Sequence, residues 1–432
     1  MSETTSTSGY STTTKISRRR QVLSGVVGMM LEMYDWQVYG LVSIYIAGQV
    51  FAGGDSTTGL LNTLLIFGVG FFIRPIGGAI MGSYADRHGR KRALVFGMVL
   101  LGLGSLLIAI VPTYSMAGPG APAILLAARL LQGFAIGGEQ GASVPFLSEI
   151  APPGKRALYN AFGYIASTVA IVFATVVAAG LPLVFGDAGA ERWAWRIPFA
   201  LGALFTVFAI YLRRNIEETE LFTSHSSEAP KKFNPLKTLV TTHIRPTLLT
   251  VLLISGITFS YYTWVLQYAT FAHLSVGLSL EKAQIFSTIS LVIFGGLQPI
   301  FAKISDRVGR RRVLILSALA QLVITWPALL LLTNNAGLFV ALQVVAMIPV
   351  AALMAVSNSA ISEFFPTSVR GVGVAFPYAV SVALFGGTAP YLVALFSSGG
   401  RVVILGGYGS LLLVFTVIAA ILMKDRHRAT LS

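Results

Sequence analysis

The stretch that decides the fold reads Gly82-Ser83-Tyr84-Ala85-Asp86-Arg87-His88-Gly89-Arg90-Lys91-Arg92. A second copy lies 220 residues later and reads Ala302-Lys303-Ile304-Ser305-Asp306-Arg307-Val308-Gly309-Arg310-Arg311-Arg312. A second pair of motifs lies 214 residues apart: Ser148-Glu149, Pro152 and Arg156 match Ser362-Glu363, Pro366 and Arg370. Two matches in the same order indicate that the chain consists of two related halves.

The composition is that of a membrane protein. Apolar residues make up 55% of the chain and charged residues 11%, whereas soluble domains carry about 25% charged residues. Several apolar runs exceed the length of about 18 residues that spans a bilayer as a helix. Charge and turn signals divide the chain into twelve predicted spans: 22–51, 58–84, 93–113, 122–149, 157–185, 195–214, 246–274, 281–304, 312–333, 337–364, 370–398 and 401–424.

The net charge of +14 is explained by topology, and nucleic-acid binding is not expected. The two tails, the gaps on the same side as the N-terminus and the span ends that adjoin them hold 25 of the 31 Lys and Arg residues. Because cytoplasmic loops are enriched in these residues, both termini are predicted to be cytoplasmic. We expect tails at 1–21 and 425–432, a cytoplasmic linker at 215–245, and six-helix halves at 22–214 and 246–424. The absence of cysteine excludes disulfides, thiol nucleophiles and thiolate metal sites.

Two parallel six-span repeats, with a substrate site between the halves, are the plan of the major facilitator transporters. The predicted fold class is therefore an all-α integral membrane protein with twelve transmembrane helices in two halves. The Asp-Arg-x-Gly-Arg loops resemble the signature loops of this superfamily. More narrowly, the chain resembles its metabolite:proton symporters, which include bacterial ketoglutarate, citrate, shikimate and proline/betaine permeases. The matching segments are 32–35, 73–78, 128–133, 137–139, 195–199 and 212–219.

This resemblance implies a multi-pass protein of the bacterial inner membrane that imports a small organic acid with protons. A di- or tricarboxylate is the first expectation, and a zwitterion such as proline or betaine, or a shikimate-like or aromatic acid, is the alternative. A proton-driven exporter and a membrane enzyme are remote alternatives. No HExxH or GxSxG string supports an enzyme, and no Walker A string supports pumping driven by ATP. The expected partners are the organic anion, protons and the lipid bilayer, with no metal or other cofactor, and the protein is expected to act as a monomer.

Glu32 and Asp35 are the predicted proton sites. Charged residues inside a span cost at least about 2.5 kcal/mol on insertion scales, so each needs a reason. The two carboxylates are three residues apart on one helical face, and nearby carboxylates release their protons in coupled steps. One of them can therefore load and unload a proton during a transport cycle, and Asp35 is preferred.

Arg129 and Arg74 are the predicted anion site. An Asp on span 1 that faces an Arg on span 4 resembles the pair found in proton-coupled sugar members of the superfamily. Protonation of Asp35 would free Arg129 to bind a substrate carboxylate through its planar fork. Arg74 lies about 18 Å from the loop at Asp86, near the middle of the membrane. Structural pairing of Arg74 with Glu32 or Glu139 is the competing interpretation.

Other polar residues are expected to line the substrate site or to form a gate. Tyr261, Trp264 and Tyr268 share one helical face, and the remaining lining candidates are Tyr34, Gln132, Tyr164, Gln267, Asn358 and Tyr378. Glu139 is interpreted as a gating or structural charge, and His273 as interfacial. Acidic residues contribute little to topology, so the acids in the loop motifs indicate a charge network at an inner gate: Asp86, Arg87, Arg90, Lys91, Glu149, Arg156, Asp306, Arg307, Arg310, Glu363 and Arg370.

Overall fold

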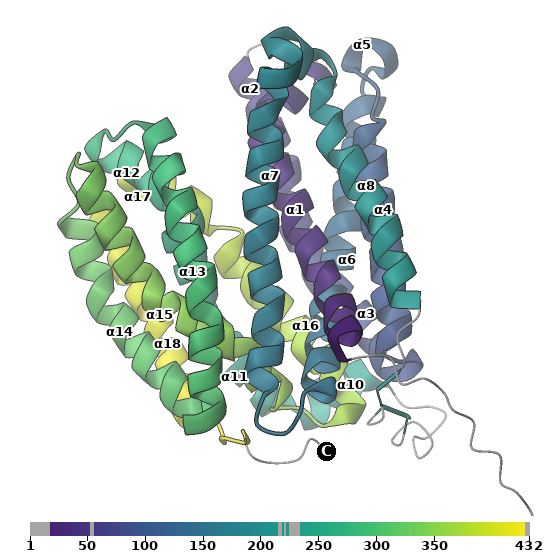
Figure 1. The fold of residues 1–432 in the computed structure, drawn as a ribbon, viewed down its shortest axis with the longest axis vertical. Helices are drawn as coiled ribbons and strands as arrows, with labels where there is room; N and C mark the ends of the chain where they lie inside the picture. The colour runs from purple at the N-terminus through teal and green to yellow at the C-terminus, as the bar shows by residue number, and fades with distance from the viewer. Residues whose placement is uncertain (1–17, 52–55, 215–217, 220–221, 224–233, 428–432) are drawn as a thin grey trace, which may run out of the picture.

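A computed structural model describes residues 18–51, 56–214, 218–219, 222–223 and 234–427. Most of the predicted N-terminal tail, much of the predicted linker and the end of the predicted C-terminal tail lie outside these ranges. All regular structure among the described residues is helical. Two bundles lie side by side, the first half in purple to teal and the second in green to yellow (Figure 1).

The described residues of the first half form eight α-helices and one short 3₁₀ helix. They are α1 (Arg18–Val50), α2 (Ser56–Phe72), α3 (Arg74–His88), α4 (Arg90–Ala109), α5 (Tyr114–Ala117), α6 (Gly120–Ile150), α7 (Arg156–Arg192), η1 (Ala194–Arg196) and α8 (Ile197–Arg214). The short helix α5 lies in the connection between α4 and α6. We call the end of the bundles that carries the α3–α4, α6–α7 and α13–α14 connections the linker end.

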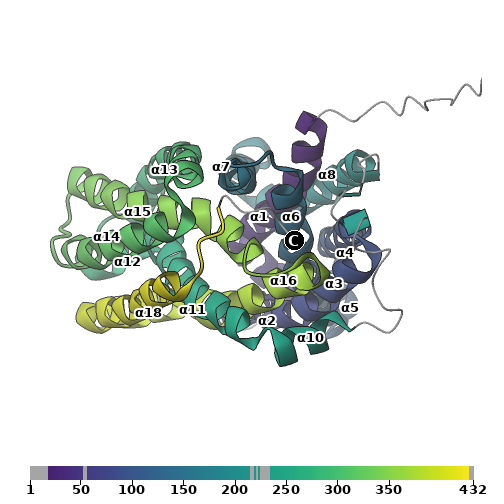
Figure 2. The same ribbon diagram turned by 90° about the horizontal axis from the view of Figure 1, so that it is seen from below.

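The second half follows α10 (Pro235–Thr242), which lies at the linker end (Figures 1 and 2). Its helices are α11 (Ile244–Ser260), η2 (Tyr261–Leu266), α12 (Tyr268–Val276), α13 (Leu280–Val308), α14 (Arg310–Leu330), α15 (Ala336–Ser362), η3 (Thr367–Val369), α16 (Arg370–Ser381), η4 (Val382–Gly386), α17 (Ala389–Ser398) and α18 (Val402–Leu422).

Ten helical runs among the described residues are long and apolar enough to cross a membrane. The other two predicted spans correspond to α1 and to α2 followed by α3. Large apolar side chains such as Leu65, Leu316 and Val323 are about two-thirds exposed or more. An apolar exterior of this kind suits lipid rather than water.

Three predicted spans are not regular α-helices along their whole length. The second span breaks at Ile73, because Pro75 has no N–H to bond the carbonyl one turn earlier. The seventh and eleventh spans contain the π-helical turns η2 and η4. Such turns insert an extra residue into the helical repeat and often lie at functional sites.

Glycines on α6 allow this helix to touch its neighbours closely. Any Cβ at Gly137 would collide with the Arg74 backbone, and one at Gly133 with the Gly70 carbonyl. Gly141 faces the backbone of Gly371 in α16, so the same stripe also contacts the second half. Figures 1 and 2 both show α16 beside α3, at the linker end of the first bundle. Small residues of this kind are the usual means of close helix contact in membranes.

Candidate functional site

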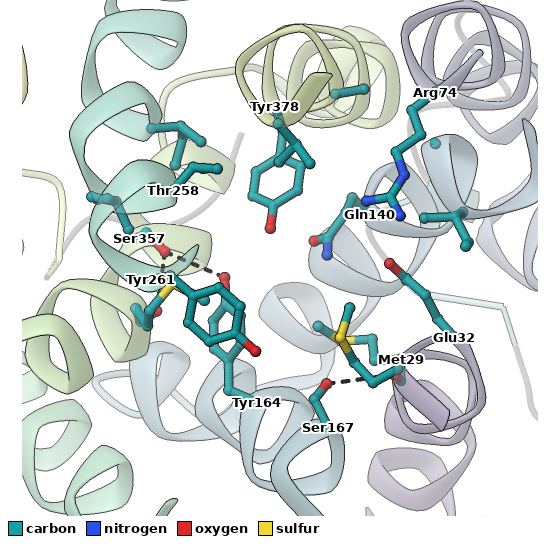
Figure 3. Close-up of a pocket in the computed structure, with 18 of the residues that line it drawn as sticks. Met29, Glu32, Arg74, Gln140, Tyr164, Ser167, Thr258, Tyr261, Ser357 and Tyr378 are labelled. Atoms are coloured by element: carbon teal, nitrogen blue, oxygen red, sulfur yellow. Dashed lines mark hydrogen bonds between the residues drawn. The ribbon is translucent and has the colours of Figure 1, made fainter. Parts of the chain in front are cut away.

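A cavity lies between the two halves, and its open space, including the mouth, totals about 770 Å³. Helices α1, α3, α6 and α7 line it from the first half, and α11, η2, α15 and α16 from the second. Its polar lining consists of Glu32, Arg74, Gln140, Tyr164, Ser167, Thr258, Tyr261, Tyr262, Ser357 and Tyr378 (Figure 3). Five of the predicted site residues are in this group: Glu32, Arg74, Tyr164, Tyr261 and Tyr378.

Arg74 begins α3 immediately after the break at Ile73 and is buried. Its guanidinium carbon lies 4.5 Å from the ring centre of Trp36 and 4.6 Å from that of Phe71. The aromatic faces orient the cation without consuming its N–H donors. Nε and Nη2 of Arg74 have no hydrogen-bond partner among the described residues. Burying such donors unpaired is costly, so this position favours an anion.

Glu32 enters the same cavity from α1, and its carboxylate points toward the side where Arg74 lies (Figure 3). It is buried, with 3% of its surface exposed. The cavity therefore contains one permanent cation and one carboxyl group that can gain or lose a proton. Protonation of Glu32 would leave the Arg74 charge uncompensated by this residue, which links proton binding to anion binding in principle.

Tyr164 and Tyr378 occupy equivalent positions in the two halves and both line the cavity. The Tyr164 hydroxyl donates a hydrogen bond to Asn358 Oδ1 at 3.0 Å, so Asn358 supports the lining from behind. Tyr261 and Tyr262 add two further phenols from η2. Hydroxyls from both halves thus face the charged pair across the cavity, at positions where a ligand can bond to both halves at once.

Asp35 and Arg129 lie in a separate polar cluster behind the cavity. Asp35 Oδ2 accepts hydrogen bonds from Ser105 Oγ and, at 3.1 Å, from Gln132 Nε2. Gln132 Oε1 accepts from Arg129 Nη1 at 2.7 Å. The amide of Gln132 therefore bridges the aspartate and the arginine. The Arg129 guanidinium also lies 3.5 Å from the ring centre of Tyr39.

The structure thus separates residues that the sequence grouped. Two residues that are three positions apart on a helix differ by about 60° around its axis. That rotation places Glu32 in the cavity and Asp35 between α1, α4 and α6. Arg129 and Gln132 are not among the residues that line the cavity.

The aromatic face expected in the seventh span is also different in the structure. Because η2 changes the helical phase, Tyr261 lines the cavity, whereas Trp264, Gln267 and Tyr268 do not. Tyr268 packs within the second half, where its hydroxyl donates to the Ala328 carbonyl at 2.8 Å. Tyr34 likewise lies inside the first half and donates to the Pro198 carbonyl at 3.0 Å. His273 contacts the Leu278 carbonyl at 2.9 Å, near the end of α12.

At the linker end, two aspartates cap helices of the opposite half. Asp86 accepts hydrogen bonds from the backbone N–H groups of Gly371 and Val372 at 2.7 and 2.8 Å, at the start of α16. Asp306 accepts from Ala157 and Leu158, both at 3.1 Å, at the start of α7. The positive ends of these helices favour a carboxylate. Each aspartate is also paired within its own half, Asp86 with Arg90 at 2.6 Å and Asp306 with Arg310 at 2.8 Å.

The remaining acids of the motifs form ion pairs across the halves. Glu149 pairs with Arg370 at 2.8 Å, and Glu363 pairs with Arg156 at 3.5 Å. The sequence placed Glu149 beside Arg156 and Glu363 beside Arg370, so the partners are exchanged between the two copies of the motif. Glu149 also lies 3.6 Å from Arg90, and Glu363 lies 3.2 Å from Arg310.

Three expected members of this network have other surroundings. Arg87 and Arg307 are exposed at the surface. Lys91 contributes its backbone N–H, which donates to Glu218 at 3.1 Å. Glu218 also accepts from the Arg90 N–H at 3.0 Å, and Asp425 accepts from the Arg311 N–H at 3.2 Å. The sequence analysis missed this pair of carboxylates, although each follows the sixth span of its half.

Gln140, Ser167, Thr258, Tyr262 and Ser357 are further lining residues that the sequence analysis did not single out. Ser and Thr hydroxyls often bond within their own helix, so their presence in a span carries little information. Tyr262 had a detectable signal, since it adjoins Tyr261, but an ideal helical repeat places the two rings about 100° apart.

Two six-helix halves, an apolar exterior and a polar cavity lined by both halves define a membrane transporter of the major facilitator fold. The comparisons with known proteins agree. Residues 21–232 match the family described as "Sugar (and other) transporter", and residues 274–431 match "Major Facilitator Superfamily". A solved structure of the proton:xylose symporter XylE superposes with a TM-score of 0.75 at 19% identity, covering 96% of this chain and 97% of that one.

The chain belongs to the metabolite:proton symporter family of the major facilitator superfamily. It is 33% identical to the alpha-ketoglutarate permease of Escherichia coli strain K12, over 99% of both chains. It is also 33% identical to the citrate-proton symporter of Salmonella typhi, over 85% of both chains. The protein is therefore a transporter and not an enzyme.

Proposed function

We propose that this protein is a proton-coupled symporter that imports a small organic acid, a di- or tricarboxylate, by alternating access. The observation that carries the proposal is Arg74, a buried guanidinium on the cavity wall with two nitrogens that lack hydrogen-bond partners among the described residues. The names of the ketoglutarate and citrate relatives support the same class of substrate. Positive loops support the bacterial cytoplasmic membrane as its location, with both termini on the cytoplasmic side.

Arg74 binds one substrate carboxylate through its planar fork. The tyrosine hydroxyls and Gln140 bind the polar groups at the other end of the substrate. A site shared by both halves lets bound substrate stabilise the closed cavity that precedes reorientation. Arg129 acts behind this site, where it holds Asp35 through Gln132, so direct contact with the substrate is assigned to Arg74.

Coupling follows from charge balance in the two clusters. Protonation of Glu32 removes a competing negative charge from the cavity and favours the substrate anion at Arg74. Protonation of Asp35 weakens the Asp35–Gln132–Arg129 chain and adds positive charge behind the cavity. Proton and anion therefore favour each other's binding. The coupling ion is the proton, no organic cofactor takes part, and one chain is the functional unit.

The linker-end network is the inner gate, and it is closed in this structure. The bonds of Asp86, Asp306, Glu149 and Glu363 hold the two halves together there. Away from the linker end the two bundles spread apart (Figure 1). This arrangement corresponds to the state that admits substrate from outside the cell, and opening to the cytoplasm requires the four acids to release their partners.

A zwitterion is the second candidate, because Glu32 and Arg74 face one cavity and together match an ammonium and a carboxylate. Uptake into proteoliposomes separates the two. We expect α-ketoglutarate or citrate, and not proline, to accumulate when an inward proton gradient is imposed. Accumulation of proline alone would select the zwitterion, and uptake that ignores the gradient would refute symport. Thermal shifts of the purified protein with each compound measure binding independently of transport.

A further inference from the structure

Glu32 borders a second cavity that lies entirely within the first half. This cavity lies between α1, α4 and α6, and its open space, including the mouth, totals about 190 Å³. Glu32 and Glu139 are its ionisable lining residues, and Gly28, Gly97, Met98, Leu101, Ala135 and Ile136 complete it. Glu32 thus lies on the partition between the central cavity and a compartment that contains another buried carboxylate.

Glu139 is held by an arginine that is fully buried. Arg213 Nη2 lies 2.7 Å from Glu139 Oε1, and Arg213 Nη1 lies 3.3 Å from Oε2. Ser143 Oγ also donates to Glu139. The same guanidinium donates to the carbonyls of Ser24 at 2.9 Å and Leu94 at 2.7 Å. These carbonyls lie near the starts of α1 and α4, so Arg213 ties Glu139 to the linker end.

Gly28 brings the Glu139–Arg213 pair against the backbone of α1. A Cβ at this position would collide with both the carboxylate and the guanidinium. Glu32 follows Gly28 by four residues, one helical turn or about 6 Å along the axis. Because Gly28 has no side chain, the Glu139 carboxylate can lie about one helical turn from Glu32, on the side toward the linker end.

We propose that Glu139 is a second proton site, which takes the proton from Glu32 and passes it toward the cytoplasm. This rests on the proposed proton symport. In the step, the O–H bond of the Glu32 carboxyl breaks and one forms on Glu139, through the small cavity, which has room on the order of one bridging water. Glu32 becomes the carboxylate, Glu139 becomes neutral, and Arg213 keeps its charge.

The charges around Glu32 and Glu139 determine when the proton moves from one to the other. Glu32 faces Arg74 from α3 and phenols from α7, η2 and α16, whereas Glu139 faces Arg213 from α8 and Ser143 on its own helix. α4 contributes only Gly97, Met98 and Leu101 to this cavity. When the substrate anion leaves Arg74, the guanidinium again favours the Glu32 carboxylate and drives its proton away. Proton release inward thereby follows substrate release.

The test is Glu139→Gln in proteoliposomes, with lumenal pH and labelled substrate recorded together. Gln keeps the shape and can still accept from Arg213, but it cannot carry the proton. We expect substrate binding and substrate exchange to remain, while gradient-driven accumulation and lumenal acidification are lost. Glu191→Gln, the same change at an exposed residue, should behave as wild type. Wild-type proton-to-substrate ratios in Glu139→Gln would overturn the proposal.

A second variant covers the case in which Glu139→Gln does not fold, because it leaves the buried Arg213 charge uncompensated. Glu139→Gln combined with Arg213→Met removes that charge. A proton-carrier role predicts that the folded double variant binds substrate and is still uncoupled, whereas restored coupling would show that Glu139 only neutralises Arg213. If the wild-type protein itself moves substrate without protons, the proposed symport fails, and this inference fails with it.

Discussion

Asp86 and Asp306 make the same contact across the boundary of the two halves in opposite directions. Asp86 of the first half caps α16 of the second, and Asp306 of the second half caps α7 of the first. The duplicated motif therefore produces two reciprocal bonds at one end of the molecule. Because each bond requires the halves to be in contact there, both must break when that end opens.

Asp86→Asn should shift the protein toward the state that is open at the linker end. Asn keeps the size but loses the charge that favours the α16 N-terminus and Arg90. A hydrogen bond to a charged group contributes roughly 1.5–3 kcal/mol, which corresponds to a shift of about 10- to 150-fold in the closed-to-open ratio. Ala375→Cys, at a buried contact with Gly78, reports opening through labelling by an impermeant maleimide.

The natural chain has no cysteine, so the reporter is the sole thiol. Arg87→Gln changes an exposed residue of the same motif and serves as the control. Labelling in Asp86→Asn that stays at the level of the control would make the motif a folding or topology device.

Charge exchange tests the pairing of the motifs across the halves. Arg370→Glu should abolish transport because it places a second acid beside Glu149, and Glu149→Arg in the same chain should restore part of it. Exchanging Glu149 with Arg156, which are close in sequence but not paired in the structure, should restore nothing. The measurement is the initial rate of uptake per inserted protein. Rescue by the within-half exchange would contradict the observed pairing.

The fold could be predicted from the sequence because its determinants are local and duplicated. Twelve apolar segments and two copies of a loop motif indicate two six-helix halves without any knowledge of tertiary contacts. The pairing of Arg156 with Glu363 and of Arg370 with Glu149, across the two halves, could not be predicted in this way. Both copies of the motif carry the same residue types, so a contact within one half and a contact between halves look alike in sequence.

The site was less predictable, because small rotations decide which side chains face the cavity. The spacing of Tyr261, Trp264 and Tyr268 indicates one face only if the helix is regular, and η2 makes it irregular. The spacing of Glu32 and Asp35 places them on one helical face, but only Glu32 lines the cavity. Arg74 had the clearest signal, a permanent charge beside Pro75 near the middle of the membrane.

Asp35→Asn should uncouple transport from the proton gradient. The Asn side chain can retain hydrogen bonds to Ser105 and Gln132 but never becomes an anion, so it imitates the protonated carrier. Gradient-driven accumulation should disappear, while exchange of labelled for unlabelled substrate survives. Glu32→Gln is the matched variant in the cavity. If Asp35→Asn accumulates substrate normally, Asp35 is not the proton site and the role is assigned to Glu32.

Arg74 variants should bind the substrate anion more weakly at every pH, because the guanidinium charge is permanent. Arg74→Gln removes a charged hydrogen-bonding partner worth roughly 1.5–3 kcal/mol, so the dissociation constant should rise about 10- to 150-fold. Arg74→Lys keeps the charge but loses the planar fork and its stacking on Trp36 and Phe71, and it should also be impaired. Arg129→Lys instead perturbs the bridge through Gln132 to Asp35, so it should flatten the pH dependence of binding. Titration of purified, folded variants across pH measures both effects. If Arg74→Gln binds the transported carboxylate with wild-type affinity, the cavity anion site is elsewhere and a zwitterionic or neutral substrate becomes the better candidate.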